Sequence, residues 1–361
     1  MNYHLIYDTT YAVDFISFCN KYFGKENNFF YVLPLHNSIR SNTDFSENNY
    51  QMTNDPLEPF KYIKTKKDYI IIHGLFENRV IAYLFLHPEL LKKRTSLVMW
   101  GGDLYSHRRV ISRGAHFKER CFDKLKKNIF QNVHNLCFDM PTDYQLMREW
   151  YKIDRPIIQI TYPQSINMDL INTTVEKKKS SKHTRSTTNI LIGNSATESN
   201  RHLEAIDFIA QYKDQDIHVY CPLSYGDKSY ANDVITYGNK IFGYEKFSGI
   251  TDYMSIDKYT DFMSQMDIAI FHNNRQQAMG NITLSSFLGC KVFISESTSM
   301  WEQYVIRGGC RFYPTEKIND MSFSEFIRNN DQDLIRNKEY FLKVSDENRL
   351  SEKWSAVFNF A

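Results

Sequence analysis

The sequence predicts an α/β protein made of two doubly wound domains that face each other across a cleft, and three observations lead to this prediction. The chain has 361 residues, more than a typical single domain. Short apolar runs such as Asp68–Phe76 alternate with amphipathic stretches in both halves, as expected for buried parallel strands joined by helices. Between the halves, Ile171–Asn189 is rich in Lys, Ser and Thr and has few apolar residues.

The change in composition sets the expected domain boundaries. We expect the first domain at residues 1–165, a polar linker at 166–188 and the second domain at 189–340. The last segment, 341–361, is predicted to form a C-terminal helix that can pack back on the first domain.

Charge, cysteine usage and hydropathy exclude several classes of protein. The formal net charge is +2, which gives no overall footprint for nucleic-acid binding. The six cysteines lack the spacing of a metal finger or a redox pair, so we expect reduced thiols in a cytoplasmic protein. No apolar run reaches the length of a membrane span, and the first residues lack the pattern of a secretory signal.

The stretch Asn189–Ile209 has the pattern of a strand, a tight loop and a helix. The loop residues that can meet a phosphate are Gly193, Asn194, Ser195 and Asn200. Free N–H groups at a helix start form an anion site, which favours a phosphate-binding turn. Neither common phosphate motif is present, so an ordinary capped turn remains the alternative.

A second loop between a strand and a helix follows Phe271. Its candidate diphosphate ligands are Arg275, Gln276, Gln277, Gly280 and Asn281. An arginine can hold a phosphate with two hydrogen bonds, and the helix that follows would point its positive end at the loop. The alternative is a loop with an exposed arginine. Its place at the carboxyl end of a strand, where ligands dock in open α/β sheets, favours a binding site.

Two residues in the first half are candidates for a general base. Asp103 follows an apolar strand in a turn with Gly101 and Gly102, where it can act as a base or cap a helix. His73 ends a buried strand, a position that suits both catalytic and structural histidines. The sequence leaves both alternatives open for each residue.

The stretch His107–Phe130 contains many more basic than acidic residues, with apolar residues between them. It fits a basic amphipathic surface that lies on anionic lipid or meets a lipid-linked phosphate, and the alternative is a solvated helix face. The candidate contacts are Arg108, Arg109, Lys126 and Lys127. No Asp-x-Asp pair is placed to hold a metal on a diphosphate, so no metal cofactor is expected.

Taken in order, these stretches resemble the bacterial 4-acetamido-4,6-dideoxygalactose (Fuc4NAc) transferase family of enterobacterial common antigen synthesis. The matching pieces are "IIIHGLF", "WGGDLY", "ILIGNS", "VYCPLSYG", "YTDFMSQMDIAIF" and "RQQAMGNITL", between Tyr69 and Glu302. The resemblance implies a metal-independent glycosyltransferase of the GT-B type, with two Rossmann-like domains. It departs from the family at Ala196 to Glu198, which leaves the identity of the donor sugar open.

The resemblance also implies substrates and a location. The donor would be a nucleotide-diphosphate deoxysugar, dTDP-linked, bound by the second domain with Tyr225 in its pocket. The acceptor would be a polyprenyl-diphosphate-linked or cell-surface glycan, met by a cytoplasmic protein associated peripherally with the inner face of the plasma membrane. Two alternatives of other classes remain: a nucleotide-sugar 2-epimerase of the same architecture, and a non-catalytic sugar-nucleotide-binding protein.

Overall fold

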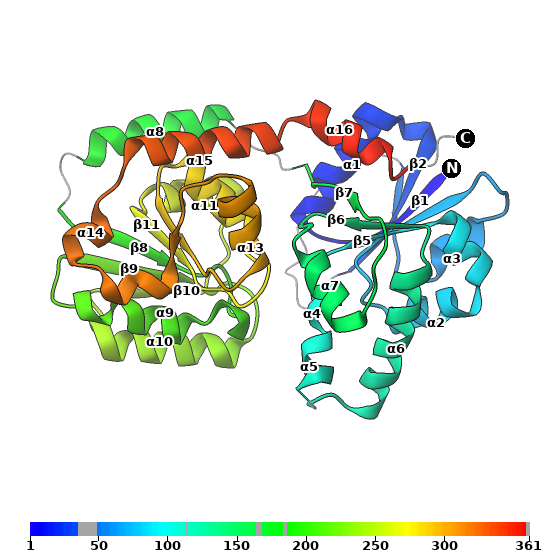
Figure 1. The fold of residues 1–361 in the computed structure, drawn as a ribbon. Coiled ribbons are helices and arrows are strands. Elements are labelled where there is room, and N and C mark those ends of the chain that lie inside the picture. The colour runs from blue at the N-terminus through cyan, green and yellow to red at the C-terminus, as the bar shows by residue number, and fades with distance from the viewer. Residues whose placement is uncertain (35–48, 113, 164–167, 183–185, 359–361) are drawn as a thin grey trace. The chain divides into compact units, whose positions relative to one another are not determined.

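The computed structural model describes residues 1–34, 49–112, 114–163, 168–182 and 186–358. The chain divides into two compact units (Figure 1). Met1–Ser165 and Val344–Ala361 form the first unit, and Ile166–Lys343 form the second. Among the described residues, no helix combines the length and the apolar character needed to cross a bilayer.

A seven-stranded parallel sheet forms the centre of the first unit, with the order β3-β2-β1-β4-β5-β6-β7. The strands are β1 Asn2–Tyr7, β2 Asn28–Leu33, β3 Tyr50–Met52, β4 Tyr69–His73, β5 Thr95–Met99, β6 Asn135–Phe138 and β7 Ile158–Gln159. Every residue of β4 and β5 is buried, because helices cover both faces of the sheet.

The first unit has eight α-helices among its described residues. They are α1 Thr10–Phe23, α2 Asn78–Leu86, α3 Pro88–Arg94, α4 Gly102–Tyr105, α5 His107–Ile111, α6 Phe117–Asn132, α7 Asp143–Tyr151 and α16 Glu347–Ser355. The C-terminal helix α16 packs in this unit, where Trp354 is fully buried and donates its indole N–H to Thr161 O at 2.9 Å.

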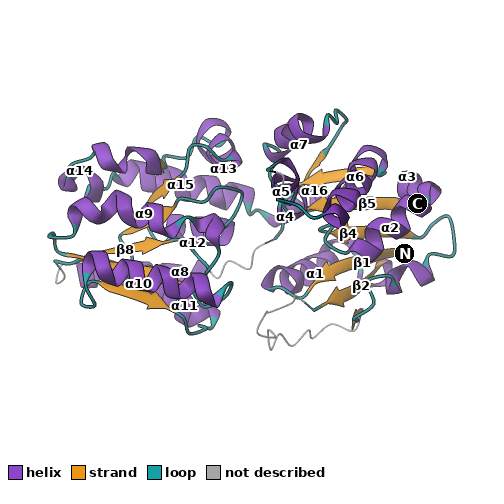
Figure 2. Cartoon of the chain, turned by 90° about the horizontal axis from the view of Figure 1, so that it is seen from below, coloured by secondary structure: helices purple, strands orange, loops and turns teal. Residues whose placement is uncertain are grey.

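The second unit contains a six-stranded parallel sheet with the order β10-β9-β8-β11-β12-β13 (Figure 2). Its strands are β8 Thr188–Ile192, β9 Ile217–Pro222, β10 Phe247–Ile250, β11 Ile268–Phe271, β12 Lys291–Ile294 and β13 Tyr313–Pro314. Its helices are α8 Met168–Lys182, α9 His202–Ile209, α10 Lys228–Phe242, α11 Ile256–Ser264, α12 Met279–Phe287, α13 Ser299–Trp301, α14 Phe323–Ile327 and α15 Asp331–Val344. A π-helix, Glu302–Arg307, continues α13.

Residues 166–188 differ from the polar linker that the sequence predicts, because α8 occupies most of this segment. Ile171 and Thr174 of α8 are buried, and the helix packs against α11. A spacing of three residues places both side chains on one face of a helix. Two inward-facing residues therefore hold a helix whose Lys- and Ser-rich composition is, by itself, typical of a loop.

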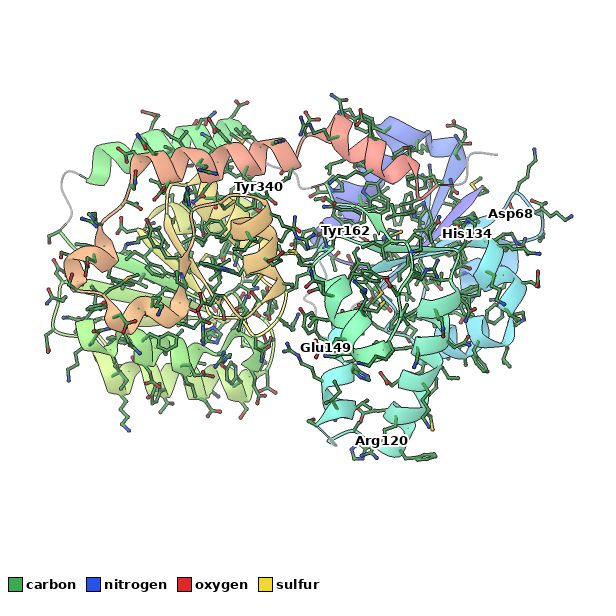
Figure 3. All side chains as sticks on the ribbon, viewed as in Figure 1. Asp68, Arg120, His134, Glu149, Tyr162 and Tyr340 are labelled. Atoms are coloured by element: carbon green, nitrogen blue, oxygen red, sulfur yellow. The ribbon has the colours of Figure 1, made fainter. Side chains whose placement is uncertain are left out.

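The first unit has a hydrophobic core on each face of its sheet. In the first unit, Ile70 and Ile72 belong to the cluster that includes α2 and α6, whereas Ile71 belongs to the cluster that includes α1 and α16. The clusters alternate because successive residues of a strand point to opposite faces. Figure 3 shows Tyr162 inside this unit, and its ring packs against Trp354 at a centroid distance of 5.5 Å.

Both sheets have the strand order of the Rossmann fold, in which the first strand lies between the second and the fourth. The direction of winding reverses between β1 and β4 in the first unit and between β8 and β11 in the second. The predicted fold class, α/β with two Rossmann-like domains, is confirmed. Ligands of such sheets bind outside the carboxyl ends of the strands at this reversal point, so the loops after β8 and β11 are the first place to look for a site.

Candidate functional site

The first predicted phosphate loop, between β8 and α9, is built around Gly193. Its φ of 69° lies in the left-handed region that favours glycine, and its N–H donates to Ile270 O of β11 at 2.9 Å. A Cβ at this position would lie 2.4 Å from Nε2 of His202. Gly193 therefore allows the start of α9 to lie close against the end of the strand.

Asn200 braces this loop from inside. The residue is fully buried, and its Nδ2 donates to Ser195 O at 2.9 Å and to Thr197 Oγ1 at 2.8 Å. Its Oδ1 accepts from the N–H of Asn194 at 3.3 Å. Asn200 and Ser195 are predicted diphosphate ligands, but both are buried, and the hydrogen bonds of the Asn200 amide are made within the loop. Of the four predicted ligands on this loop, Asn194 is the partly exposed one.

The second predicted loop is joined to the first through Gln277. Its Nε2 donates to Asn194 Oδ1 at 3.3 Å and to Thr197 Oγ1 at 3.0 Å. Its Oε1 accepts from Ser199 Oγ at 2.6 Å, and Asn274 N donates to Ser199 O at 2.9 Å. The structure thus brings the two predicted loops together at the reversal point between β8 and β11.

A third loop, which follows β9, completes the cluster. Tyr225 O accepts from Ala196 N at 2.7 Å, and the Tyr225 hydroxyl accepts from Asn194 Nδ2, also at 2.7 Å. Gly226 has a φ of 113°, and a Cβ there would lie 2.3 Å from Ala196 O, so only glycine allows the two loops to pair this closely. Tyr225 is 55% exposed, so a ligand can reach its ring, whereas its hydroxyl is hydrogen-bonded to the first loop.

The helix after the second loop, α12, begins at Met279 and carries Gly280 and Asn281 in its first turn, as the sequence predicts. Asn281 Nδ2 donates to the hydroxyl of Tyr259, a residue of α11, at 3.0 Å. Gln276 Nε2 contacts Met279 Sδ at 2.8 Å, which turns this amide along its own loop. Tyr259 was not predicted: the stretch that contains it reads as an amphipathic helix, and nothing local marks its hydroxyl.

Arg275 supplies the positive charge of the cluster. Its Nη1 donates to Gln276 O at 3.0 Å. Burial raises the pKa of the Tyr225 phenol, and hydrogen bonds from Ser195 and Asn194 together with the charge of Arg275 oppose that increase. The Arg275 charge therefore acts at the same hydroxyl that Asn194 holds. In the part of the chain that the structure describes, no group of three or more His, Cys, Asp or Glu side chains is placed to hold a metal ion.

In the first unit, Asp103 is fully buried and braces two loops. Its Oδ2 accepts from Leu75 N at 3.1 Å and Trp100 N at 3.3 Å, and its Oδ1 accepts from Leu104 N at 3.0 Å. Burial raises its pKa, while these hydrogen bonds and the charge of Lys126 oppose the increase. Asp103 lies inside the first turn of α4, whose N-cap is Gly101, so it does not cap this helix, and its role as a base stays a prediction.

His73 is also fully buried and lies within a chain of hydrogen bonds. Trp100 Nε1 donates to the Tyr162 hydroxyl at 2.8 Å, and this hydroxyl contacts His73 Nδ1. On the other side of the ring, His73 Nε2 contacts His4 Nδ1 at 3.1 Å. His4 Nε2 in turn contacts Asn28 Oδ1 at 3.2 Å. Burial lowers the pKa of His73 well below 6.5 and that of His4 to about 3. Two neutral histidines satisfy the whole chain with one donor for each acceptor.

The predicted basic surface is only partly at the surface. Arg108, Arg109 and Lys127 are exposed, but Lys126 is buried, and its Nζ donates to Asp103 O at 3.2 Å and to Ser106 Oγ at 3.0 Å. The prediction that Lys126 faces a membrane or acceptor is therefore wrong. Its amine turns inward because a backbone carbonyl and a hydroxyl of α4 and its C-cap accept from it.

The remaining basic residues surround exposed apolar side chains. The surface of Phe117, at the start of α6, is 83% exposed, and that of Ile111, at the end of α5, is 54% exposed. Arg108 lies over the ring of Tyr105 at 4.8 Å. Figure 3 shows Arg120 beside the turn between α5 and α6, so basic and apolar groups share this end of the unit.

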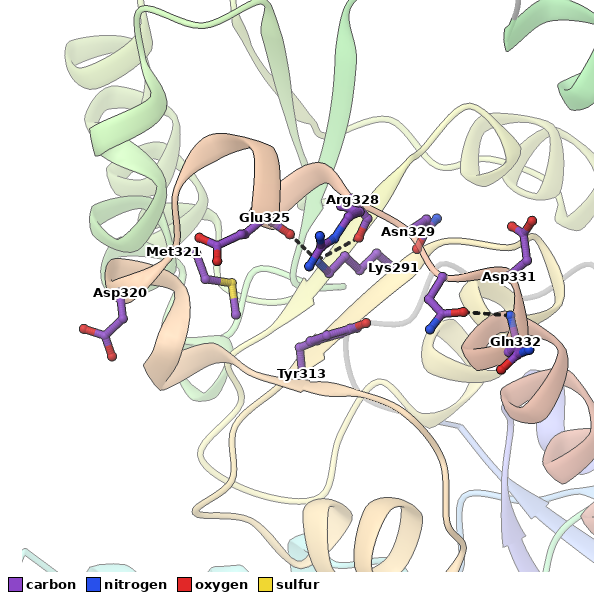
Figure 4. Close-up of a pocket in the computed structure, with 10 residues that line it drawn as sticks. Lys291, Tyr313, Asp320, Met321, Glu325, Arg328, Asn329, Asp331 and Gln332 are labelled. Carbon is purple, nitrogen blue, oxygen red and sulfur yellow. Dashed lines mark hydrogen bonds between the residues drawn. The ribbon is translucent and has the colours of Figure 1, made fainter.

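A cavity of about 670 Å³ lies elsewhere in the second unit (Figure 4). Lys291, the first residue of β12, donates its Nζ to Glu325 O at 2.7 Å and Arg328 O at 3.1 Å, and lies 4.3 Å from the centre of the Tyr313 ring. Burial lowers the pKa of Lys291 to about 8. This cavity opens at the amino end of a strand, whereas ligands of open α/β sheets bind at the carboxyl ends.

Solved structures place the fold in a known class. A glycosyltransferase from Rickettsia africae is 12% identical, with a TM-score of 0.68 and coverage of 99% of this chain and 97% of that one. HepE from Anabaena, in complex with UDP, is 9% identical, with a TM-score of 0.69 and 99% coverage of both chains. A UDP-forming α,α-trehalose-phosphate synthase from Burkholderia vietnamiensis is 8% identical, with a TM-score of 0.68 and 99% coverage of both. The fold is that of the GT-B glycosyltransferases.

The family follows from the sequence match. Residues 43–345 match the model of the family described as 4-alpha-L-fucosyltransferase, glycosyl transferase group 56, and the chain belongs to this family. The protein is a glycosyltransferase, as the resemblance implied. The match sets aside the epimerase and the non-catalytic binding protein that the sequence analysis left open.

Proposed function

We propose that this protein transfers a Fuc4NAc-like deoxysugar from a nucleotide diphosphate, with dTDP as the first candidate, to a hydroxyl of a lipid-linked or cell-surface glycan. One observation carries the donor half of the proposal. Asn194, Gln277 and Tyr225, from three separate loops, are hydrogen-bonded together beside Arg275 at the reversal point of the second unit. The family description supports a deoxysugar, because fucose is 6-deoxygalactose.

In the proposed reaction, the acceptor hydroxyl attacks the anomeric carbon, and the bond from that carbon to the diphosphate breaks. The negative charge that develops on the diphosphate is met by Arg275 and by N–H groups at the start of α12. Fixed positive groups at this position can take the part that a divalent cation has in other transferases, so we expect turnover to persist with a chelator present.

The acceptor hydroxyl has to lose a proton if the transfer inverts configuration. Asp103 is our first candidate for the base and His73 the second. Both side chains are fully buried here, so either would need access to the acceptor before it could act. Catalytic contacts often tighten only in the complex with substrate, and the assignment is therefore tested by substitution.

We place the acceptor and the inner face of the plasma membrane at the exposed end of α5 and α6. Arg108, Arg109 and Lys127 are exposed there, and Phe117 projects into solvent. Basic side chains attract anionic lipid headgroups and polyprenyl diphosphates, and an exposed aromatic ring can enter the headgroup region. The protein would thus be cytoplasmic and bound to the membrane peripherally.

A thermal-shift screen of nucleotides tests the donor assignment. A ligand that binds only the native state raises the melting temperature. We expect dTDP to stabilise the protein more than UDP or GDP at equal concentration. If no nucleoside diphosphate raises the melting temperature, the proposed donor site is wrong, and stabilisation by UDP alone would change the base but keep the site.

A further inference from the structure

Tyr259 has a feature that the proposed function does not use. Its hydroxyl oxygen accepts a hydrogen bond from Asn281 Nδ2 at 3.0 Å. A phenol is both a donor and an acceptor, so when its oxygen accepts, its own hydrogen turns toward another group. Asn281 belongs to the first turn of α12, next to the proposed diphosphate. The phenol hydrogen of Tyr259 can therefore donate to a ligand bound beside that helix start.

The hydroxyl oxygen of Tyr225 also accepts a hydrogen bond, at the end of a chain of amides and hydroxyls. Gln277 Oε1 accepts from Ser199 Oγ, so Gln277 Nε2 is the end that donates to Asn194 Oδ1. Asn194 then presents its Nδ2 to the Tyr225 oxygen at 2.7 Å. With the amides in these orientations, the Tyr225 oxygen accepts, and its own hydrogen is the last one in the chain. Such chains polarise their members, which strengthens the final donor.

The two phenols belong to one cluster. Burial raises the pKa of Tyr259, and the charge of an ionised Tyr225 adds to that increase, while the hydrogen bond from Asn281 opposes it. The Arg275 charge acts on Tyr225 as well. Raised pKa values keep both hydroxyls protonated at neutral pH, so both can donate to an anion.

We propose that Tyr225 and Tyr259 are a pair of phenol donors for the donor diphosphate, oriented by Asn194 and Asn281. The inference rests on the proposed function and deepens it, because it names Tyr259 as a binding residue that the sequence did not reveal. Phenol hydrogen bonds to a charged oxygen are stronger than neutral ones, and they strengthen further as charge develops on the leaving diphosphate. The pair therefore contributes to donor binding and to turnover.

The test compares Tyr259→Phe with the wild-type protein by calorimetric titration with dTDP, UDP and the matching nucleosides. A lost hydrogen bond to a charged group weakens binding about tenfold to a hundredfold. We expect that loss for the nucleoside diphosphate that the wild type binds, with the nucleoside affinity unchanged. Tyr225→Phe is expected to behave in the same way.

Tyr244→Phe is the matched control, because the surface of Tyr244 is 83% exposed and lies outside the cluster. It should leave every affinity unchanged. If Tyr259→Phe does not fold, Tyr225→Phe carries the test, since it removes the other phenol hydrogen of the pair and adds no charge. That variant should also lose diphosphate affinity and keep nucleoside affinity.

The outcomes separate the two proposals. A wild-type protein that binds no nucleoside diphosphate overturns the proposed function itself. A wild-type protein that binds one, with Tyr259→Phe binding it equally well, overturns the phenol pair and leaves the proposed function standing. An equal loss for nucleoside and diphosphate would show that Tyr259 only supports the fold, which also overturns the inference.

Discussion

The two units share one strand order, but the polar candidate residues near their strand ends differ in exposure. In the second unit, the loops after β8, β9 and β11 present Asn194, Tyr225 and Arg275 at a polar cluster. In the first unit, His73 ends β4 and Asp103 follows β5, and both side chains are fully buried and hydrogen-bonded to neighbours. The candidate ligands of the second unit are therefore accessible, whereas the two candidate bases of the first unit are enclosed. Topology locates a site, and the side chains decide whether it is used.

The largest expected effect comes from removing the positive charge of Arg275 in the polar cluster of the second unit. Arg275→Ala should lower turnover by about a hundredfold to a thousandfold, as the loss of a group that stabilises transition-state charge does. Steady-state transfer assays with the donor varied give turnover and KM. The melting temperature should change little, because Arg275 is partly exposed in a loop.

Arg311→Ala is the control, since Arg311 is an exposed arginine elsewhere in the same unit. It should keep full turnover. Unchanged donor binding and turnover in Arg275→Ala would remove the leaving-group role from this loop.

The buried chain of hydrogen bonds through His73 and His4 should make the stability of the first unit depend on pH. A histidine whose pKa is depressed by folding stabilises the native state above its ordinary pKa of 6.5, and this contribution is lost as the pH falls toward the folded value. His4, with a folded pKa of about 3, and His73 both lie in this class. We expect the urea concentration at the unfolding midpoint to fall as the pH is lowered from about 7 to about 4. Tryptophan fluorescence measures this midpoint.

Two variants sharpen this prediction. Replacement of both His4 and His73 by Gln should flatten the decline, because Gln cannot take up a proton. His116→Asn should keep it, since His116 is exposed. A wild-type midpoint that stays constant over this range would contradict the neutral network.

The Asp103→Asn variant tests whether the buried carboxylate only supports the fold or also acts as the general base. The asparagine has one acceptor oxygen in place of two, so at least one of the three backbone N–H groups loses its partner, at a cost of about 1–3 kcal/mol. We expect a lower melting temperature and unchanged dTDP affinity, because the donor site lies in the other unit. If Asp103 is also the base, turnover disappears even where the variant is fully folded. Full turnover in the folded variant would remove it from the mechanism.

The smallest effect per residue is expected at the membrane surface. Each basic residue near an anionic leaflet contributes about 1 kcal/mol to binding. Replacing Arg108, Arg109 and Lys127 by Glu should weaken co-sedimentation with vesicles that contain phosphatidylserine or phosphatidylglycerol. Phe117→Ser should weaken it further by removing an exposed ring.

A charge-matched control replaces Lys213, Lys240 and Lys317, which are exposed in the second unit, by Glu. It should keep vesicle binding. Equal binding by wild type and both triple variants would rule out a specific basic surface on α5 and α6.

The fold could be predicted from the sequence because its signals are local. The apolar run at Tyr69–His73 is long enough for a strand buried on both faces, and similar runs elsewhere give the alternation of strands and helices. The helix α8 was missed because its anchor is two buried residues among many polar ones. Burial of such a helix depends on α11, a distant element that the local composition does not reveal.

The candidate site was predicted in outline only. The loops around Gly193 and Gln277 could be found, since each follows an apolar strand. The bracing role of Asn200, the burial of Lys126 and the contact between Tyr259 and Asn281 depend on side chains brought together by folding. For Asp103, the sequence offered a base and a cap as alternatives, and it could not reveal the contact with the backbone of Leu75, 28 residues away; the role as a base stays a prediction.

Amide hydrogen exchange with and without dTDP tests the central claim most directly, because it locates a bound ligand along the chain. If dTDP binds at the polar cluster of the second unit, amide exchange should become slower in residues 193–200 and 274–281. Exchange in the buried residues around His73 should stay unchanged. Protection confined to the cavity around Lys291, or protection absent from both loops while dTDP is bound, would contradict the assignment of the donor site.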